Sequence, residues 1–496
     1  MKNSHSYKEI IKLFQKSSVQ KSVIIMFWLG IWQIAAAMMH NDILLVGPFQ
    51  VEKALLENIS RVDFLKIIIY SFGRIGLGFL LALILGFSLG ALSYRFRISE
   101  AFLAPLITTL QSIPVASFVV LLLIWFGSEA LSFFSSFLVV FPSVYINTIS
   151  GFKSTDKQLL EMADVFHVKG WNRFLYIYRP AVMPYLISCL KNSLGLSWKS
   201  GVAAEVIGIP RFSLGERLYM SKIYLDTAGL FAWTLMVIFL SFVFEKAVLY
   251  LIKEFAEWRP YPVMDRRTIQ KEEYVKFQPV FSSNCTNNAI PDIRICNLSK
   301  AYGKQQVLSD LACTIKNGGR YCLMAPSGSG KTTLLRLINR IELPDAGTIE
   351  GLPEYIGAVF QEDRLCEEYD VISNIMLTMK REGREKENGC KNVIIAESVK
   401  KEALNILPEE CLTKKVSELS GGMRRRCAIL RALLSDAELL IMDEPFTGLD
   451  DENREKTAVY ILNKLNGRTL IVSTHREEDI ELLDAVQIKL PEQKIQ

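Results

Sequence analysis

Several familiar signals are missing from this 496-residue sequence. Its nine cysteines form no C-x-x-C pair and have no histidine partner, so they give no sign of a metal or redox site. Several lie in apolar segments, as reduced, buried thiols do, which fits a cytosolic compartment. The net charge is only +5, and Lys and Arg fall mainly where loops beside a membrane would lie. Nucleic acid is therefore not an expected partner.

Charged residues are scarce between residues 22 and 252, where long apolar runs fill the chain. Half of all residues are hydrophobic, an unusual share for a soluble protein, and a division of the chain explains it. We expect a transmembrane domain at 1–253, a linker at 254–290 and a soluble domain at 291–496. The first domain is predicted to be all-α and polytopic, and the last to be α/β.

Six apolar runs each reach the length that crosses a lipid bilayer. Five lysines precede the first run, but no small-residue cleavage site follows, so we expect an uncleaved helix. Six spans place both ends of the chain on one side, and the positively charged loops assign that side to the cytoplasm. The sequence thus predicts a multi-pass protein of the cytoplasmic membrane. The expected spans are 23–39, 65–94, 101–126, 131–152, 183–208 and 228–252.

The most informative stretch of the soluble half lies between an apolar run at 320–324 and a helical pattern at 334–338. It follows G-x-x-x-x-G-K-[ST], except that Ala325 replaces the first glycine. Glycines let backbone N–H groups turn toward a phosphate, Lys331 can reach the terminal phosphates of ATP, and Thr332 can bind Mg²⁺. The methyl group of Ala325 reduces the freedom of this loop but leaves its cradle intact. The predicted ATP-binding loop comprises Ala325, Pro326, Ser327, Gly328, Ser329, Gly330, Lys331, Thr332 and Thr333.

Two further signals follow this loop. Four apolar residues precede Asp443, which predicts a buried strand that aims Asp443 at the metal from its carboxyl end. Glu444, the next residue, can polarise the attacking water. Upstream, Ser420, Gly421 and Gly422 open a helix, where two glycines and a capping serine make a second anion site.

The run Leu419-Ser420-Gly421-Gly422-Met423-Arg424 resembles the signature motif of ABC ATPases, with Met423 in place of the usual glutamine. The resemblance implies that Tyr302 stacks on adenine, that Gln361 reaches Mg²⁺ and the attacking water, and that His475 contacts the γ-phosphate. In this family the signature of one domain closes the ATP that is bound to another. Because the chain has one phosphate loop and one signature, the resemblance implies a homodimer.

Residues 153–182 are too charged to span a membrane. Their pattern resembles the EAA loop of bacterial ABC importer permeases, which implies a short helix-turn-helix that docks on the ATPase and transmits its motion. His167 stands where that family has glycine, which leaves the turn geometry open. An amphipathic surface loop without a coupling role is the alternative. The residues that match the coupling pattern are Glu161, Ala163, Gly170 and Pro180.

The fifth predicted span contains Lys199 and Glu205, which point about 120° apart on an ideal helix. They either face a water-filled substrate path or pair with other spans. Residues 196–208 and 224–227 resemble permeases that import nitrate, sulfonates, taurine and related solutes. This resemblance implies import of a small anion with a separate extracytoplasmic solute-binding protein. An ATP-driven signalling complex that moves no solute is the alternative, and short cytoplasmic loops disfavour an exporter.

Overall fold

The computed structural model describes residues 17–39, 41–168, 170–257, 291–326, 328–379 and 389–489, and the chain divides into two compact units. A helical unit comprises Met1–Ser154 and Val182–Glu257, and a soluble unit comprises Thr155–Ala181 and Trp258–Gln496. The loop expected to couple the two halves therefore belongs to the soluble unit. The lysines before residue 17, the linker from residue 258 onward and Ser327 lie outside the described residues.

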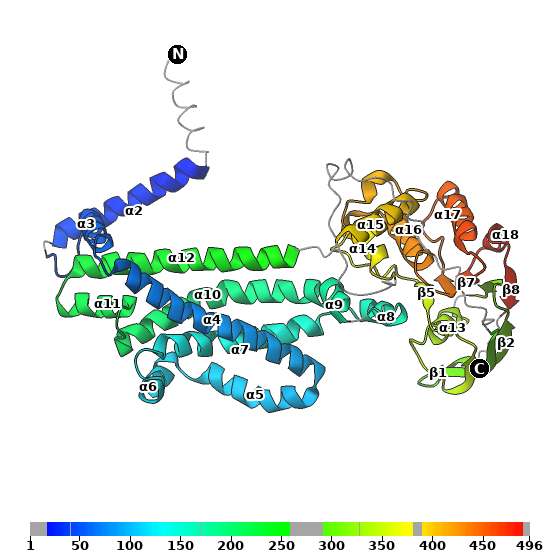
Figure 1. Cartoon of the computed structure of the whole chain (residues 1–496), viewed down its shortest axis with the longest axis horizontal. Coiled ribbons are helices and arrows are strands. Elements are labelled where there is room, and N and C mark those ends of the chain that lie inside the picture. The colour runs from blue at the N-terminus through cyan, green and yellow to red at the C-terminus, as the bar shows by residue number, and fades with distance from the viewer. Residues whose placement is uncertain are drawn as a thin grey trace, which may run out of the picture. The chain divides into compact units, whose positions relative to one another are not determined.

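The helical unit consists of long helices whose neighbours approach closely (Figure 1). At Gly78 in α4, a Cβ atom would lie 2.2 Å from the carbonyl oxygen of Phe133, so only glycine permits this approach to α7. The buried hydroxyl of Ser136 in α7 donates to the carbonyl of Ile75 in α4 (3.0 Å). The helices are α2 (Ser17–Met39), α3 (Pro48–Ile59), α4 (Phe64–Arg95), α5 (Arg97–Ser112), α6 (Val115–Phe126), α7 (Leu131–Lys153), α10 (Arg179–Gly208), α11 (Leu214–Ile223) and α12 (Thr227–Glu257).

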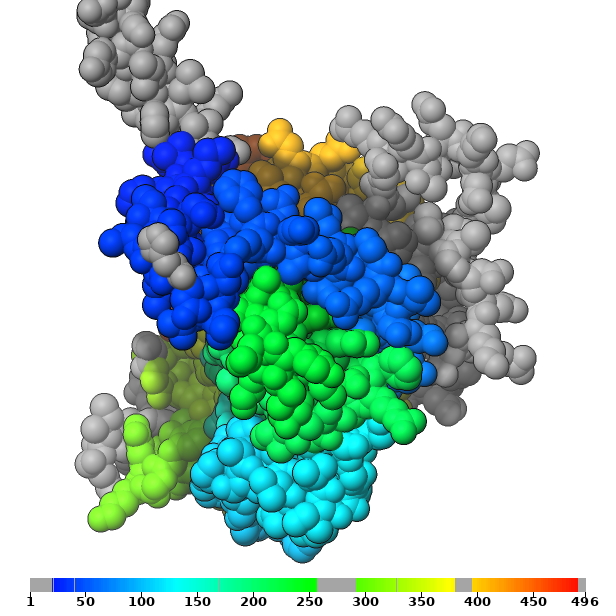
Figure 2. All heavy atoms as spheres, turned by 90° about the vertical axis from the view of Figure 1, so that its left-hand side faces the viewer, coloured from blue at the N-terminus to red at the C-terminus, as the bar shows by residue number. Residues whose placement is uncertain are grey.

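Large apolar side chains lie exposed on several of these helices, as expected for contact with lipid. Ile238 and Phe239 of α12 are each about 60% exposed in the single chain. Figure 2 shows one face of this unit, where α4 (blue), the α11–α12 region (green) and residues around α6 (cyan) form a continuous surface. Such a surface suits a bilayer or a second protein chain.

Four described helices are long and apolar enough to cross a membrane, or five if one bent pair counts as a single span. They are α2, α4, α7 and α12, and the bent pair is α5 with α6. The predicted count of six is therefore not confirmed. The difference lies in α10, which is long enough but carries Lys191, Lys199 and Glu205.

The third predicted span, 101–126, is not one straight helix. It breaks after Ser112, and α5 and α6 meet at 106°. Pro114 occupies the N-cap of α6, where its missing N–H leaves no hydrogen bond unmade. Proline has therefore broken this segment rather than curved it, which gives either a broken span or a re-entrant loop.

The soluble unit contains two sheets (Figure 1). The larger is parallel in the order β5-β6-β7-β3-β8, and its inner strands β6 and β7 are buried along their whole length. The smaller is antiparallel in the order β2-β1-β4 and includes the strand pair expected before the phosphate loop. The strands are β1 (Ile293–Tyr302), β2 (Gln305–Ile315), β3 (Arg320–Met324), β4 (Ala346–Glu350), β5 (Ile356–Val359), β6 (Leu439–Asp443), β7 (Thr469–Thr474) and β8 (Val486–Lys489).

The helices of the soluble unit come from both of its segments. Those of residues 155–181 share one hydrophobic core with the sheet, because Met162, Phe166 and Tyr176 are buried in the same cluster as Leu440 and Ile441. The helices are α8 (Lys157–Val165), α9 (Gly170–Arg173), the π-helix η1 (Phe174–Tyr178), α13 (Lys331–Ile338), α14 (Val371–Met376), α15 (Gly389–Ala403), the 3₁₀-helices η2 (Glu409–Cys411) and η3 (Val416–Glu418), α16 (Gly421–Leu433), α17 (Asp451–Lys464) and α18 (Glu478–Leu482).

Candidate functional site

The loop between β3 and α13 has the backbone that phosphate binding requires. Gly328 and Gly330 have φ angles of 82° and 89°, in the left-handed region that favours glycine. At Gly330 a Cβ atom would also come within 3.0 Å of the Val307 carbonyl oxygen. Ala325 does not have a positive φ, so its backbone conformation does not require glycine. The loop therefore keeps its turns despite this substitution.

Lys331 opens α13 as a buried cation. Its ammonium donates to the carbonyl oxygens of Pro326 (3.1 Å) and Ala325. Burial lowers the pKa of Lys331, and the nearby carboxylates of Glu444 and Asp443 oppose that shift. A partly desolvated ammonium with few competing waters attracts phosphate oxygens strongly.

The oxygen atoms beside Lys331 fit a magnesium ion. The Thr332 hydroxyl lies 3.1 Å from Asp443 Oδ2, and the Ser473 hydroxyl donates to the other carboxylate oxygen. Gln361 lines the same cavity as Thr332 and Asp443. Hydroxyl, carboxylate and amide oxygens are the ligands that Mg²⁺ takes when phosphates complete its coordination. Within the described ranges no group of three His, Cys, Asp or Glu side chains could hold a metal by itself.

Glu444 has a strained backbone and two side-chain partners. Its φ is 51°, a conformation that costs a non-glycine residue about 1–3 kcal/mol. One carboxylate oxygen lies 2.8 Å from His475 Nε2, and the other accepts from the Thr447 hydroxyl (3.2 Å). The end of β6 therefore presents Glu444 in a fixed orientation beside the phosphate loop, as a general base requires.

Tyr302, the last residue of β1, lies close to the phosphate-loop helix although it precedes Ala325 by 23 positions in the sequence. Its ring is 46% exposed, and its hydroxyl bonds to Glu342 and lies near Thr333. Burial of the phenol and the bond to the Glu342 carboxylate both raise the pKa of Tyr302. An exposed aromatic face beside the loop can accept a nucleotide base by stacking.

Ser420, Gly421 and Gly422 lie at the start of the 13-residue helix α16. Ser420 occupies the N-cap, but its side chain makes no capping hydrogen bond, so that detail of the sequence interpretation was wrong. Gly422 packs closely on Gly448, since a Cβ there would lie 3.0 Å from the Gly448 carbonyl oxygen. Ser420 and Gly421 are exposed, which leaves the N–H groups of this helix end available to a ligand.

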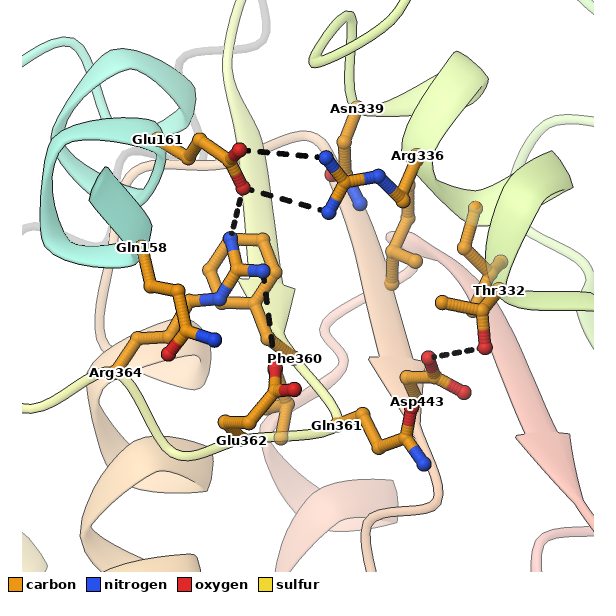
Figure 3. Close-up of a pocket in the computed structure, with 13 residues that line it drawn as sticks. Gln158, Glu161, Thr332, Arg336, Asn339, Phe360, Gln361, Glu362, Arg364 and Asp443 are labelled. Atoms are coloured by element: carbon orange, nitrogen blue, oxygen red, sulfur yellow. Dashed lines mark hydrogen bonds and ion pairs between the residues drawn. The ribbon is translucent and has the colours of Figure 1, made fainter. Parts of the chain in front are cut away.

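A cavity of about 230 Å³ joins the candidate metal-binding oxygens to residues 155–181 (Figure 3). On one side it is lined by Thr332, Gln361 and Asp443, and on the other by Gln158 and Glu161 of α8. No signature residue is among the described residues that line it. Residues 155–181, which contain the predicted coupling loop, thus face the same space as Gln361 and the candidate metal-binding residues.

Glu161 is held by two arginines at this cavity (Figure 3). Arg364 Nη1 donates to Oε2 (2.8 Å), and Arg336 approaches both carboxylate oxygens at 3.3 and 3.4 Å. Arg336 also donates to Glu342 (2.6 Å), the partner of Tyr302. A chain of charged groups therefore connects α8 to the phosphate-loop helix and to the segment that follows Gln361.

Residues 155–181 make further bonds to the rest of the soluble unit. Arg179 donates to the Tyr369 hydroxyl (2.8 Å), which donates to the carbonyl of Leu175 (2.6 Å). Ala163 is fully buried, and Pro180 lies half-buried at the start of α10. These contacts show that residues 155–181 pack on the rest of the soluble unit, whereas their coupling role stays a prediction.

His167 forms the turn where the EAA pattern has glycine. Its φ is 53°, and the N–H of Val168 reaches back to the carbonyl of Ala163 (2.7 Å), so the left-handed helix ending is preserved. The imidazole lies 2.9 Å from the Glu354 carbonyl and edge-on to Tyr355. These contacts offset the backbone strain. Gly170, with a φ of 56°, makes the second turn.

Residues 308–447 match the family model described as ABC transporter, a range that includes the phosphate loop, Gln361, the signature residues and Glu444. The soluble unit is an ABC-type ATPase. Residues 78–256 match the model described as binding-protein-dependent transport system inner membrane component. The chain thus combines a permease-type helical domain with an ATPase in one polypeptide.

The curated relatives of the soluble unit include proteins named for export and proteins named for import. The chain is 36% identical over 204 residues to Nod factor export ATP-binding protein I of Rhizobium etli, and this match covers 38% of the chain and 62% of that protein. It is 32% identical over 214 residues to sulfate/thiosulfate import ATP-binding protein CysA 2 of Rhizobium meliloti, covering 40% and 57%. The chain thus spans less than two thirds of the length of these relatives.

One similar solved structure is the dimer of the ATP-binding cassette MJ0796 in a post-hydrolysis state with ADP and phosphate. It is 28% identical, with a TM-score of 0.36, and the match covers 40% of this chain and 94% of that one.

In the helical unit, Lys199 and Glu205 differ in their surroundings. Lys199 is exposed in the single chain, whereas Glu205 is fully buried. Ser71 Oγ donates to Glu205 Oε2 (2.8 Å), which also accepts from the N–H of Gly215 (3.2 Å). Glu205 thus joins α10 to α4 and α11, which favours pairing with other helices over exposure to a path.

Sequence reasoning did not single out Arg336 and Arg364, the ATPase residues that bind Glu161. The sequence position of Arg336 could have identified it. Arg336 lies four residues after Thr332 on α13, so both side chains share the face that lines the cavity. Arg364 has a φ of 48° and lies in an irregular segment after β5, where no periodicity predicts the direction of its side chain.

Proposed function

We propose that this chain is one half of an ATP-driven importer of a small anion across the cytoplasmic membrane. The observation that carries the proposal is the cavity at which Glu161 of the coupling loop meets Arg336 and Arg364 beside Thr332 and Asp443. Any change in charge at the metal-binding oxygens acts over a few ångströms on the groups that hold the coupling loop. ATP binding and hydrolysis therefore have a direct route to the permease sequence.

The chain's own residues account for the hydrolytic step. Lys331 and the N–H groups of the phosphate loop bind the phosphates, and Thr332, Asp443 and Gln361 hold Mg²⁺, which supplies charge neutralisation when bound. Glu444 orients the attacking water and accepts its proton, while His475 fixes the carboxylate of Glu444. Tyr302 provides the stacking surface for adenine.

The complete transporter is proposed to be a homodimer. The described part of the cavity contains phosphate-loop, acidic-strand and Gln361 residues but none from the signature, and Ser420 and Gly421 stay exposed. A signature from a second copy would add N–H donors to the phosphates across the dimer interface. Two chains would also supply two permease halves around one central path.

Import is favoured over export by the helical unit. The family model that it matches is described as part of binding-protein-dependent transport systems, which implies a separate extracytoplasmic solute-binding protein. The distribution of positive loops places both termini and the ATPase in the cytoplasm. The resemblance of residues 196–208 to nitrate, sulfonate and taurine permeases favours an anionic solute, as does the name of the sulfate/thiosulfate relative. In this proposal the helical unit crosses the membrane six times, with α10 as one of the spans.

The test is transport by the purified full-length protein in proteoliposomes, with its solute-binding protein. Labelled sulfate, nitrate, taurine and alkyl sulfonates are supplied on the side of the binding protein and ATP on the side of the ATPase domain. We expect one of these solutes to accumulate on the ATP side, and the Glu444→Gln variant to abolish its accumulation.

Two results would contradict the proposal. Movement of solute away from the ATP side would make the protein an exporter. ATP hydrolysis that is lost in Glu444→Gln but moves no solute of a broad panel would favour the alternative of a signalling or force-transmitting complex.

A further inference from the structure

Arg425, on the second turn of α16, is a buried cation that the functional assignment above does not use. Its side chain is about 3% exposed, and Asp363 is the one carboxylate paired with it among the described residues (3.1 Å). A charge removed from water in this way needs several hydrogen bonds to offset its desolvation. The partners that supply these bonds lie in two separate segments.

The two ends of the guanidinium bind two different stretches of backbone. Nη1 donates to the carbonyl oxygens of Phe360 (2.6 Å) and Gln361 (3.3 Å). Nη2 donates to the carbonyl oxygens of Glu444 (2.7 Å) and Asp443. One planar group therefore holds the segment that carries Gln361 and the segment that carries Glu444.

These bonds begin where the sheet ends. The parallel pairing of β5 with β6 stops at Val359 opposite Met442. The next residues along the two strands are Phe360 and Asp443, and the carbonyl oxygens of both accept hydrogen bonds from Arg425. The guanidinium bridges the two strands just beyond their last ladder position, and the fixed geometry of its donors sets their separation.

The same bonds stabilise a strained peptide. Glu444 has a φ of 51°, and its backbone is held at both ends, because its N–H donates to Ser473 (3.0 Å) and its carbonyl accepts from Arg425. Without the guanidinium, the strand end can relax to an ordinary conformation, which would redirect the Glu444 carboxylate.

We propose that Arg425 is a positioning residue for ATP hydrolysis, which fixes Gln361 and Glu444 relative to each other without touching the nucleotide. This inference rests on the ATPase activity and goes beyond the residues that bind phosphate and metal. Because Arg425 belongs to the helix that starts with the signature residues, a displacement of α16 also moves both hydrolytic segments together.

The test compares kcat and KM for ATP in the wild-type protein, Arg425→Gln and Arg425→Lys. Displacement of a reacting group by about an ångström reduces turnover by roughly 10- to 100-fold, so we expect kcat of Arg425→Gln to fall in that range. KM for ATP should change less than about threefold, because the groups that bind the nucleotide remain. Lysine keeps the charge but lacks the planar fork, so its kcat should lie between the other two.

Arg468 provides a matched control. Like Arg425, it donates to several backbone carbonyls, but it precedes β7 at the opposite end of the sheet. Its five acceptors are the carbonyl oxygens of Leu433, Lys464, Leu465, Ser435 and Ala437. We expect Arg468→Gln to lower the thermal midpoint and to leave kcat per folded molecule unchanged.

A folded Arg425→Gln variant with wild-type kcat, or one whose defect lies in KM alone, would overturn the proposal. If the glutamine variant does not fold, Arg425→Lys decides in the same way, because a wild-type kcat in that variant also overturns it. A wild-type protein without ATP hydrolysis would instead refute the ATPase activity itself and leave these ratios undefined.

Discussion

The two ends of the five-stranded sheet differ in how their polar and charged groups are arranged. At the amino end, polar groups pair with one another: the Thr469 hydroxyl donates to Asn317 (3.0 Å) and accepts from the Gly318 N–H (2.9 Å). At the carboxyl end, the buried charges of Lys331 and Asp443 lie beside the strained backbone of Glu444. At the amino end these groups satisfy one another, whereas at the carboxyl end buried charge lies beside a cavity that Asp443 lines.

This difference supports the expectation that the carboxyl end of the sheet is used for chemistry. A hydrogen bond within the protein stabilises the fold and offers nothing to a ligand, whereas buried charge and strain are tolerated where a ligand benefits from them. The carboxyl ends of parallel strands are where ligands of open α/β sheets bind. Substitutions at the two ends should therefore have different consequences, activity at one and stability at the other.

The largest effect is expected for Glu444→Gln at the carboxyl end. Loss of a general base lowers turnover by about 10²- to 10⁴-fold, while the groups that bind phosphate remain. We expect ATP hydrolysis to be lost and ATP binding to persist, as measured by steady-state phosphate release and equilibrium binding. The control is Glu452→Gln, an exposed carboxylate paired with Lys456. Equal turnover in both variants would contradict a catalytic role for Glu444.

A second prediction concerns the coupling loop, which contacts the carboxyl end through Glu161. In Glu161→Gln the ion pairs with Arg336 and Arg364 are lost, and for partly exposed pairs this weakens docking by about 1 kcal/mol, or fivefold to tenfold. We expect transport per ATP hydrolysed to fall by roughly that factor, while basal hydrolysis remains. The assay is uptake and phosphate release measured on the same proteoliposomes.

Asp164→Asn is the matched control for this variant. Asp164 lies on the same helix, α8, but is exposed and pairs with Arg173 rather than with the ATPase core. It should leave the ratio of transport to hydrolysis unchanged. A parallel loss in both variants would mean that the effect does not depend on the ion pairs of Glu161 with Arg336 and Arg364.

The smallest effect is expected at the amino end. Asn317→Ala removes the hydrogen bond to Thr469, which contributes about 1 kcal/mol to the free energy of unfolding. For a unit of this size, that corresponds to a decrease of roughly 2–4 °C in the thermal midpoint. Turnover of the folded protein should stay at the wild-type level. A clear loss of kcat without a change in midpoint would break the division between the two ends.

Much of the sheet could be predicted because buried parallel strands have continuous apolar sequences. The runs before the phosphate loop and before Asp443 became β3 and β6 with nearly the expected bounds. The helical unit was harder to predict. Hydropathy alone does not reveal the 106° break at Pro114, and α10 mixes ionisable residues with apolar ones.

The contacts that organise the site depend on residues far apart in the chain. Glu161 meets Arg364 across 203 residues, and Arg425 meets Phe360 across 65. A motif can indicate that Glu161 docks on the ATPase, but no spacing in the sequence specifies which arginine receives it. His167 shows a further limit of prediction from motifs. It replaces the glycine of the EAA pattern, and yet its backbone adopts the same left-handed turn.

The most direct test of the contrast between the two ends is the thermal midpoint with and without a non-hydrolysable ATP analogue and Mg²⁺. At about 100 times its dissociation constant, such a ligand raises the midpoint of a unit of this size by roughly 5–10 °C. We predict this shift for the wild-type protein and for Asn317→Ala, and its absence for Lys331→Ala. An undiminished shift in Lys331→Ala, or a lost shift in Asn317→Ala, would contradict the assignment of nucleotide binding to the carboxyl end of the sheet.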